Sequence, residues 1–380
     1  MGRDGRRILK YMEQDLKVLM IGSDRKLFEN GSAVSERMKE YGNLVGELHI
    51  ILMCNASHGL KDKQLSDNVW VYPTNSFTSI LRPIDAARIG KKLVFEKKFV
   101  RGRSLITCQD LESGWAGVRI KKKWRIPMEL QFHTDINSPY FTGFQNRVRK
   151  FFANKVLRNA DSIRVVSESV TQKLKIENSK LKILPIYVDK EKIANAPIRF
   201  DVHARYPWHF IILMVCRLEP EKNIGLALEA LALVRQKYGD TGLLVVGSGS
   251  LENSLRGKTG VELAGWQSDL ASFYKTSNVF LQTSLYEGYG LALVEAGLSG
   301  LPVLSTPVGI VKELEDGKDL YICSSAEQFA LRIIELIENN SKRENLRVNM
   351  KKTLEDKLIS KEEYLNRLKT NWESTAKKVP

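Results

Sequence analysis

The residues best suited to chemistry lie in TSLYEGYGLALVEAGLSGLPVLST, residues 283–306, where Glu287 and Glu295 stand eight positions apart around a turn with two glycines. The preceding NVFLQTS is β-branched and aromatic, as buried strands are, and LALVEAGLSG predicts the helix that follows. A loop between a strand and a helix presents unpaired backbone N–H groups at the positive end of the helix dipole. The stretch therefore predicts an anion site beside two carboxylates.

The two glycines and the second carboxylate indicate which kind of anionic ligand the site could bind. Gly288 and Gly290 allow a ligand to approach the backbone closely. Glu295, about one turn into the helix, can reach back to the same loop, where a carboxylate could accept hydrogen bonds from the two hydroxyls of a ribose. This is the outline of a nucleotide-sugar site. The alternative is that Glu287 caps a helix and Glu295 lies on a solvated face, but the spacing, both glycines and the strand placement favour the site.

Two cations follow an earlier predicted strand. After HFIILMV comes CRLEPEKN, which places Arg217 and Lys222 at the start of a helix. Two cations there can bind a diphosphate and offset its growing charge as it leaves. The alternative is that both pair with Glu219 and Glu221 on the surface. The chain has no Asp-x-Asp motif, so we expect neither a metal nor another cofactor.

Size and composition favour a globular protein of two domains, since the chain has 380 residues and 43% hydrophobic content. The apolar run at 210–216 is far shorter than the ~18–20 residues that span a bilayer. The charged segment 1–15 has no apolar core of a signal peptide, and it is expected to be a disordered extension. The cysteines form no CxxC pair and indicate reduced core residues of a cytosolic protein: Cys54, Cys108, Cys216 and Cys323.

Strand-like and helix-like segments alternate, which predicts parallel sheets with helices on both faces. The predicted strands are 16–22, 47–54, 68–73, 104–109, 128–133, 162–167 and 181–188, then 209–215, 242–247, 261–265, 278–283 and 302–306. The predicted helices include one from its cap Ser32 to Gly42, a basic one at 144–159, and only helices after Cys323. The irregular stretch 189–208 predicts a linker between domains at 1–190 and 205–357.

The motifs RLEPEKN, VVGSG, VELAGW and TSLYEGYGLALVEAGLSGLPVLST resemble the donor-binding domain of the retaining glycosyltransferases of family 4, also called glycosyltransferase group 1. The resemblance is close over about residues 209–323 and looser in the N-terminal half. It implies the GT-B architecture, an α/β fold of two Rossmann-like, doubly wound parallel-sheet domains facing each other across a cleft. It also implies that the last helix, about 358–380, packs back onto the first domain.

The resemblance assigns roles to individual residues. Arg217 and Lys222 match the residues that hold the donor diphosphate, and Glu295 matches the ribose ligand. Glu287 matches a residue that faces the sugar and phosphates, together with its loop Gly288, Tyr289, Gly290 and Leu291. Retention is thought to need no enzymic nucleophile in this family, the leaving phosphate assisting the acceptor on the same face. A glycosidase is disfavoured, because Glu295 is poorly placed to be the nucleophile ~5–5.5 Å from a partner acid.

Three further positions are candidate donor contacts. Gly247 and Gly249 follow a predicted strand, and Glu252 replaces the third glycine of a dinucleotide motif; in similar proteins this loop lies near the nucleotide. Trp266 is interpreted chiefly as a buried structural residue, with packing on the base as the alternative. The first loop lacks the Gly-Gly pair of many relatives, and phosphate contact is expected instead where Gly31 and Ser32 begin a helix.

The N-terminal half is expected to supply the acceptor site. His133 ends a predicted strand where the resemblance implies a catalytic histidine near the sugar; the alternative is a polar residue satisfied locally. The acceptor candidates are Gln109, Asp110 and Asp135.

The basic charge of the chain, +15 overall, lies wholly in residues 1–200, which have 37 Lys and Arg against 21 Asp and Glu. Such an excess suggests a polyanionic partner, and the runs 91–103 and 147–158 fit the inner face of an anionic plasma membrane. We therefore expect a metal-independent hexosyltransferase that uses a UDP- or GDP-sugar and a glycan or lipid-linked acceptor of cell-surface polysaccharide synthesis. The alternatives are a soluble acceptor, or a nucleic-acid-binding protein with a vestigial nucleotide pocket, although no nucleic-acid motif is present.

Overall fold

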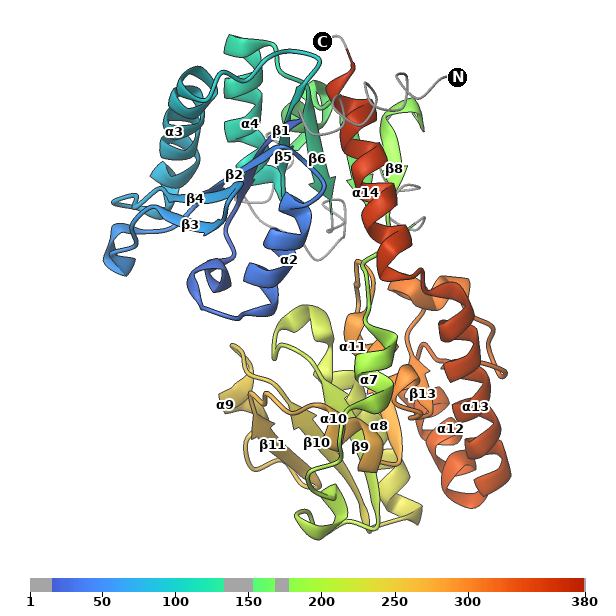
Figure 1. The fold of residues 1–380 in the computed structure, drawn as a ribbon. Coiled ribbons are helices and arrows are strands. Elements are labelled where there is room, and N and C mark those ends of the chain that lie inside the picture. The colour runs from blue at the N-terminus through green and yellow to red at the C-terminus, as the bar shows by residue number, and fades with distance from the viewer. Residues whose placement is uncertain (1–15, 133–152, 168–177, 379–380) are drawn as a thin grey trace, which may run out of the picture. The chain divides into compact units, whose positions relative to one another are not determined.

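A computed structural model describes residues 16–132, 153–167 and 178–378 of the chain, which forms two compact units. Unit 1 comprises residues 1–185 and 361–380, and unit 2 comprises residues 186–360 (Figure 1). Among the sequence predictions, the extension 1–15, His133, Asp135 and residues 144–152 of the basic helix lie outside the described residues.

In the part of unit 1 that the structure describes, the sheet has eight strands in the order β3-β4-β2-β1-β5-β6-β7-β8. They are β1 (Lys17–Gly22), β2 (Glu47–Leu52), β3 (Lys63–Ser66), β4 (Val69–Pro73), β5 (Ser104–Cys108), β6 (Met128–Phe132), β7 (Ser162–Val165) and β8 (Leu181–Ile183). All seven predicted strands are confirmed. The edge strand β3 was not predicted, and it runs antiparallel to β4. KQLS carries no alternation of buried apolar residues, so its pairing could not be seen in the sequence.

Helices cover both faces of this sheet. Among the described residues they are α2 (Ala33–Gly42), α3 (Arg82–Glu96), α4 (Leu111–Trp124), a helical segment at 153–159, and α14 (Lys361–Ala376). On β6, Leu130 faces Gly114 of α4, whereas the adjacent Glu129 accepts a hydrogen bond from Trp372 of α14. Since neighbouring strand residues point to opposite faces, α4 and α14 pack on opposite sides of the sheet.

Helix α14 is anchored to unit 1 by a buried polar network. The Trp372 indole donates to Glu129 over 3.2 Å, and the hydroxyls of Tyr364 and Tyr41 of α2 lie 2.8 Å apart. Arg164 of β7 lies 3.5 Å from the same Glu129 carboxylate, so the charges are compensated although both side chains are buried. The end of the chain therefore belongs to the unit that its beginning builds.

The sheet of unit 2 has six parallel strands in the order β11-β10-β9-β12-β13-β14. They are β9 (Phe210–Val215), β10 (Thr241–Val246), β11 (Val261–Gly265), β12 (Val279–Gln282), β13 (Val303–Ser305) and β14 (Tyr321–Ile322). The five predicted strands are confirmed; β14, of two residues, was too short to predict. The chain builds outward from β9 to β11 and then returns to β12 on the other side of β9, which creates a switch point between β9 and β12.

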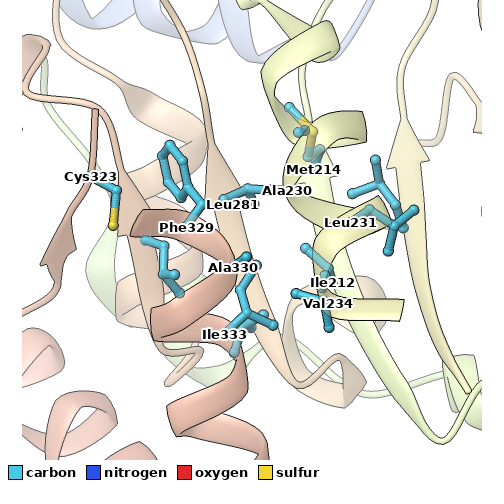
Figure 2. Close-up of a cluster of buried hydrophobic side chains, with 14 of the residues drawn as sticks. Ile212, Met214, Ala230, Leu231, Val234, Leu281, Cys323, Phe329, Ala330 and Ile333 are labelled. Atoms are coloured by element: carbon cyan, nitrogen blue, oxygen red, sulfur yellow. The ribbon is translucent and has the colours of Figure 1, made fainter. Parts of the chain in front are cut away.

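The helices of unit 2 are α7 (Lys190–Asn195), α8 (Ile224–Lys237), α9 (Glu252–Leu255), α10 (Ala271–Thr276), α11 (Leu291–Leu298), α12 (Ala326–Glu338) and α13 (Asn340–Lys357). Apolar residues of α8 and α12 pack with β9 and β12 in one core (Figure 2). Ile212, Leu231 and Phe329 of this cluster are at most 3% exposed. Burial of such side chains stabilises the fold by ~1.5–3 kcal/mol each and holds the two strands beside the switch point.

The predicted linker 189–208 is packed onto unit 2. It contains helix α7, and the Lys275 ammonium of α10 donates to the carbonyls of Ala194 and Ala196 at 2.6 Å. The rings of Phe200 and Phe273 meet edge to face at 5.0 Å. The stretch lacks periodicity because it is held by individual contacts to α10 rather than by an apolar stripe of its own.

Within the described ranges, no helix has the length and apolar content to cross a bilayer. The four cysteines are free; Cys54, Cys108 and Cys323 are buried and Cys216 is half-buried.

Candidate functional site

The loops that follow β9 and β12 meet at the switch point of unit 2. The Thr283 hydroxyl donates to the backbone carbonyls of Lys222 and Asn223, each over 3.0 Å. The Leu285 N–H donates to the Glu221 carbonyl over 2.9 Å. These bonds join two loops that are some sixty residues apart in the sequence. They place the predicted cations and the predicted carboxylate loop in one site.

Lys222 and Glu287 form the centre of this site. The Lys222 ammonium lies 2.6 Å from the Glu287 carboxylate, and the side chains are only 13% and 16% exposed. The Ser284 hydroxyl donates to the same carboxylate oxygen over 2.8 Å. An ammonium has three donor protons, so its bond to Glu287 is compatible with donation to an anionic ligand as well.

Glu287 and Gly290 bound a loop with a constrained backbone. Gly290 has φ +100° and precedes the first residue of α11, where no side chain caps the helix. Gly309 packs against this loop so closely that an added Cβ would lie 2.3 Å from the Tyr289 carbonyl oxygen. Tyr289 is buried, Gly288 is half-buried and Leu291 is 39% exposed. The uncapped N-terminus of α11 therefore presents backbone donors beside Lys222 and Glu287.

Glu295, one turn into α11, is half-buried and accepts a hydrogen bond from the Tyr274 hydroxyl of α10 over 3.1 Å. Burial raises the pKa of the Glu295 carboxyl above its usual range, and the bond from Tyr274 opposes this rise. Burial also raises the pKa of Tyr274 strongly, so the phenol stays protonated and acts as the donor. The geometry holds Glu295 as an acceptor with a fixed orientation.

Arg217 lies in the loop after β9, and the glycine loop after β10 packs against this loop. The Arg217 side chain is 73% exposed, and its guanidinium lies 2.7 Å from the Glu221 carboxylate. The alternative that Arg217 pairs with a neighbouring glutamate on the surface is therefore confirmed. Lys222, in contrast, pairs with Glu287, while Glu219 accepts from the Ser250 N–H and hydroxyl. An exposed ion pair is weak, which leaves Arg217 able to turn to an anionic ligand.

Gly247 and Gly249 permit close backbone packing between the loops after β9 and β10. A Cβ on Gly247 would lie 1.9 Å from the Cys216 carbonyl oxygen, and one on Gly249 would lie 2.5 Å from the Leu218 carbonyl oxygen. These glycines therefore shape the rim of the site.

The prediction that Trp266 is a buried structural residue is wrong, because its side chain is 70% exposed. It follows Gly265, which has φ +67° at the end of β11. The positive φ turns the chain out of the sheet, so the indole lies on the surface rather than in the core. A stacking partner for this ring is not present in the described structure of unit 2.

The candidates of unit 1 lie at its own switch point, beyond the adjacent strands β1 and β5. Gln109 packs on Gly22, and Asp110 caps α4 by accepting from the Ser113 N–H over 2.7 Å. Gly31, with φ +71°, precedes Ser32, whose hydroxyl accepts from the Ser35 N–H over 3.1 Å and so caps α2 as predicted. Both Asp110 and Ser32 thus have a structural role as helix caps. His133 and Asp135 lie outside the described residues.

Two site residues were not predicted from the sequence. Tyr274 orients Glu295, and Ser284 orients Glu287. Ser284 could have been found, since it follows β12 directly within the motif. Tyr274 carries no such signal, because it lies on a helix before the strand and reaches Glu295 only through tertiary packing. No cluster of three or more metal-ligating side chains occurs in the described part of the chain.

Comparison with known proteins relates this site to one family. Residues 198–353 match the family model described as "Glycosyl transferases group 1". The chain is 31% identical over 168 residues to a UDP-Gal:alpha-D-GlcNAc-diphosphoundecaprenol alpha-1,3-galactosyltransferase of Escherichia coli, covering 40% of this chain and 43% of that protein. It is 27% identical over 249 residues to the capsular polysaccharide biosynthesis glycosyltransferase CapM of Staphylococcus aureus, covering 61% and 65%. The matches thus span less than two thirds of either relative.

Solved structures share the fold over nearly the whole chain. Anabaena Alr3699/HepE in complex with UDP and glucose matches with a TM-score of 0.72 at 18% identity, covering 94% of this chain and all of that one. The sucrose-phosphate synthase of Thermosynechococcus elongatus matches with a TM-score of 0.76 at 16% identity, covering 94% and 98%. These likenesses confirm the predicted fold class, GT-B.

Proposed function

We propose that this chain is a group 1 glycosyltransferase and that it moves a hexose with retention from a nucleotide diphosphate sugar to a glycan or lipid-linked acceptor. Support comes from the match of residues 198–353 to the group 1 family model and from the similar glycosyltransferases. The observation that carries the proposal is the meeting of Lys222 with Glu287 at the N-terminus of α11, with Glu295 in the next turn. Anion-binding donors, a cation and a ribose-type acceptor are thereby gathered at one switch point.

In the proposed mechanism the protein positions the donor and stabilises charge. Lys222, Arg217 and the backbone of α11 hold the diphosphate and offset the charge that develops as the glycosidic bond breaks. The leaving phosphate oxygen takes the proton of the acceptor hydroxyl, which attacks from the same face and so retains the configuration. Glu287, held by Lys222 and Ser284, contacts the sugar, and Glu295 binds the ribose hydroxyls. His133 is proposed to assist at the sugar.

Because two cations are available for the diphosphate, the reaction is proposed to need no metal. The donor is proposed to be a UDP- or GDP-sugar, and the acceptor a growing cell-surface polysaccharide or its lipid-linked precursor. The location proposed is the cytoplasmic side of the plasma membrane. Support comes from relatives whose names include capsular polysaccharide biosynthesis and a diphosphoundecaprenol acceptor.

A donor screen tests the proposal. The full chain is incubated with UDP-, GDP- and ADP-sugars, and release of the nucleotide diphosphate is measured with the anomeric configuration of the product. We expect release from one donor class, a retained configuration, and a rate at least ~100-fold lower for Glu295→Ala. Glu229→Ala, an exposed glutamate of α8, is the matched control and should keep the normal rate. A Glu295→Ala protein that transferred at the normal rate from every donor would refute the assignment.

A further inference from the structure

Unit 1 exposes a cluster of large apolar side chains between β4 and α3. Phe77 is 89% exposed and Ile80 is 83% exposed, and they are followed by Leu81 at 38% and Ile84 at 43%. Isolated apolar residues on a surface are ordinary, but four within eight positions form a contiguous stretch that marks an interaction site.

The backbone that carries this cluster is firmly held. Immediately before it, Thr74 and Ser76 are buried, and their N–H groups donate to the carbonyls of Leu52 and Cys54 over 2.9 Å each. Immediately after it, the Arg82 guanidinium donates to Asn55 over 2.8 Å. The fold therefore holds Phe77 and Ile80 outward on an anchored loop.

Basic residues continue the cluster along α3. Ile84, Arg88 and Lys92 recur every four positions and so share one helix face, and all three are exposed. Phe95 extends this face and is 71% exposed, and Lys98 follows the helix. Residues 77–103 contain eight Lys and Arg against two acidic residues, Asp85 and Glu96. Arg88 lies 3.2 Å from Asp85 and Lys92 lies 3.8 Å from Glu96, but such exposed pairs are weak. The surface is thus apolar at one end and has an excess of positive charge along its length.

We propose that this α3 docking surface, formed by Phe77, Ile80, Leu81, Ile84, Arg88, Lys92 and Phe95, binds an anionic lipid bilayer. The apolar side chains enter the boundary between headgroups and acyl chains, and the cations bind the anionic headgroups. Ile80, Leu81 and Ile84 favour lipid over nucleic acid, because aliphatic side chains do not stack on bases as aromatic rings do.

The α3 docking surface lies near the acceptor candidates of unit 1. Strands β4, β2, β1 and β5 are parallel, so the loop after β4 lies at the same edge as Gly31, Gln109 and Asp110, which follow β1 and β5. Docking would bring this edge to the lipid surface, where a lipid-linked acceptor is presented. Only this purpose rests on the proposed function; the binding itself does not.

Flotation of the full chain with vesicles tests the surface. Vesicles of phosphatidylglycerol and phosphatidylcholine are compared with vesicles of phosphatidylcholine alone. We expect flotation with the anionic vesicles that weakens with added salt, and at least ~10-fold weaker binding for the double variant Phe77→Ser, Ile80→Ser. The pair Arg88→Gln, Lys92→Gln should also weaken anionic binding by ~10-fold or more.

The matched control is Leu331→Ser, Val348→Ser, which removes two apolar side chains of unit 2 that are 63% and 52% exposed. It should float as the unchanged chain does. Circular dichroism checks that each variant is folded. The rise in Tm on addition of UDP-glucose checks that the donor site is intact, so that loss of vesicle binding is not confused with loss of the donor site. The proposal is overturned if the Phe77, Ile80 variant floats normally, if the chain binds an RNA oligonucleotide but no vesicle, or if the variant only converts a dimer to a monomer.

Discussion

At the scale of residues, the Tyr274 hydroxyl and the Glu295 carboxylate form one unit, since their bond of 3.1 Å orients the proposed ribose ligand. Tyr274 is 2% exposed, so water has little access to its hydroxyl and cannot easily replace the bond to Glu295. Loss of the hydroxyl should therefore act on donor binding through Glu295 rather than by direct contact.

Tyr274→Phe should weaken UDP-glucose binding by ~10-fold, because hydrogen bonds to charged groups contribute ~1.5–3 kcal/mol and only part of this is felt by the ligand. Calorimetric titration measures the change. Tyr238→Phe removes an equivalent bond, to Glu338 over 2.6 Å, and should leave donor affinity unchanged. Equal affinities in both variants would show that Tyr274 plays no positioning role.

Donor affinity should fall as pH is lowered through the raised pKa of Glu295, since the ionised carboxylate is the better acceptor for ribose hydroxyls. The free energy of unfolding should depend on pH in the opposite direction to donor affinity. Because the folded pKa exceeds the unfolded one, Glu295 reduces the free energy of unfolding as pH rises from the ordinary carboxyl range through the raised pKa. Titrations should use UDP-glucose, whose phosphates lack the ionisation of pKa about 6 found in phosphate monoesters. Glu295→Gln should abolish this part of the pH profile; an unchanged profile would assign it to another group.

The pair Lys222 and Glu287 should couple strongly in a double-mutant cycle. Lys222→Met or Glu287→Gln alone should lower the free energy of unfolding by about 2–4 kcal/mol, because each leaves a largely buried charge without its partner. The coupling energy from chemical denaturation should exceed the ~0.2–1 kcal/mol expected for the exposed pair Arg217 and Glu221, measured in parallel. Similar coupling for the two pairs would contradict the burial argument.

At the scale of elements, the site depends on glycines that let loops approach one another. The loop after β10 passes over the end of β9 with Gly247 at φ +138°, a conformation that other residues rarely adopt. Gly225 in α8 differs, because it is exposed and nothing lies within 4 Å of an added Cβ.

Gly247→Ala should therefore destabilise unit 2 by more than about 2 kcal/mol and weaken donor binding, through the clash with the Cys216 carbonyl and the strained φ. Gly225→Ala should stabilise the chain by up to about 1 kcal/mol, since alanine favours helix. Thermal unfolding of both variants checks the two opposite signs. A stable Gly247→Ala protein with normal affinity would mean that the loop can move without cost.

At the scale of the whole molecule, the two units divide the chemistry. Unit 2 gathers the proposed donor ligands at the switch point between β9 and β12, whereas unit 1 carries the acceptor candidates and the α3 docking surface. Helix α14 completes unit 1 from the far end of the chain, through Trp372 and Tyr364.

A bound donor should stabilise the whole chain. UDP-glucose or the matching GDP-sugar at 100 times its Kd should add ~2.7 kcal/mol, which corresponds to roughly 5–10 °C in Tm for a unit of this size. The shift should persist in EDTA, because Arg217 and Lys222 rather than a metal are proposed to hold the diphosphate. A shift that EDTA removes and Mg²⁺ or Mn²⁺ restores would overturn metal independence.

Much of the fold was predictable from the sequence because its signals are local. Buried strands such as FIILMV and TGLLVV, and the cap of Ser32 before α2, are set by the residues themselves. In a parallel sheet the residues after each strand lie at one edge, so the sequence places CRLEPEKN and the Glu287 loop at the same edge of the sheet.

Tertiary structure alone decided which side chains meet and which are buried. Lys222 pairs with Glu287 rather than with a neighbour in the sequence, because β12 lies beside β9. Tyr274 reaches Glu295 through the packing of α10 on α11, and Trp266 lies on the surface although an isolated tryptophan suggests a core. Burial and pairing depend on contacts between distant segments, and no local pattern encodes them.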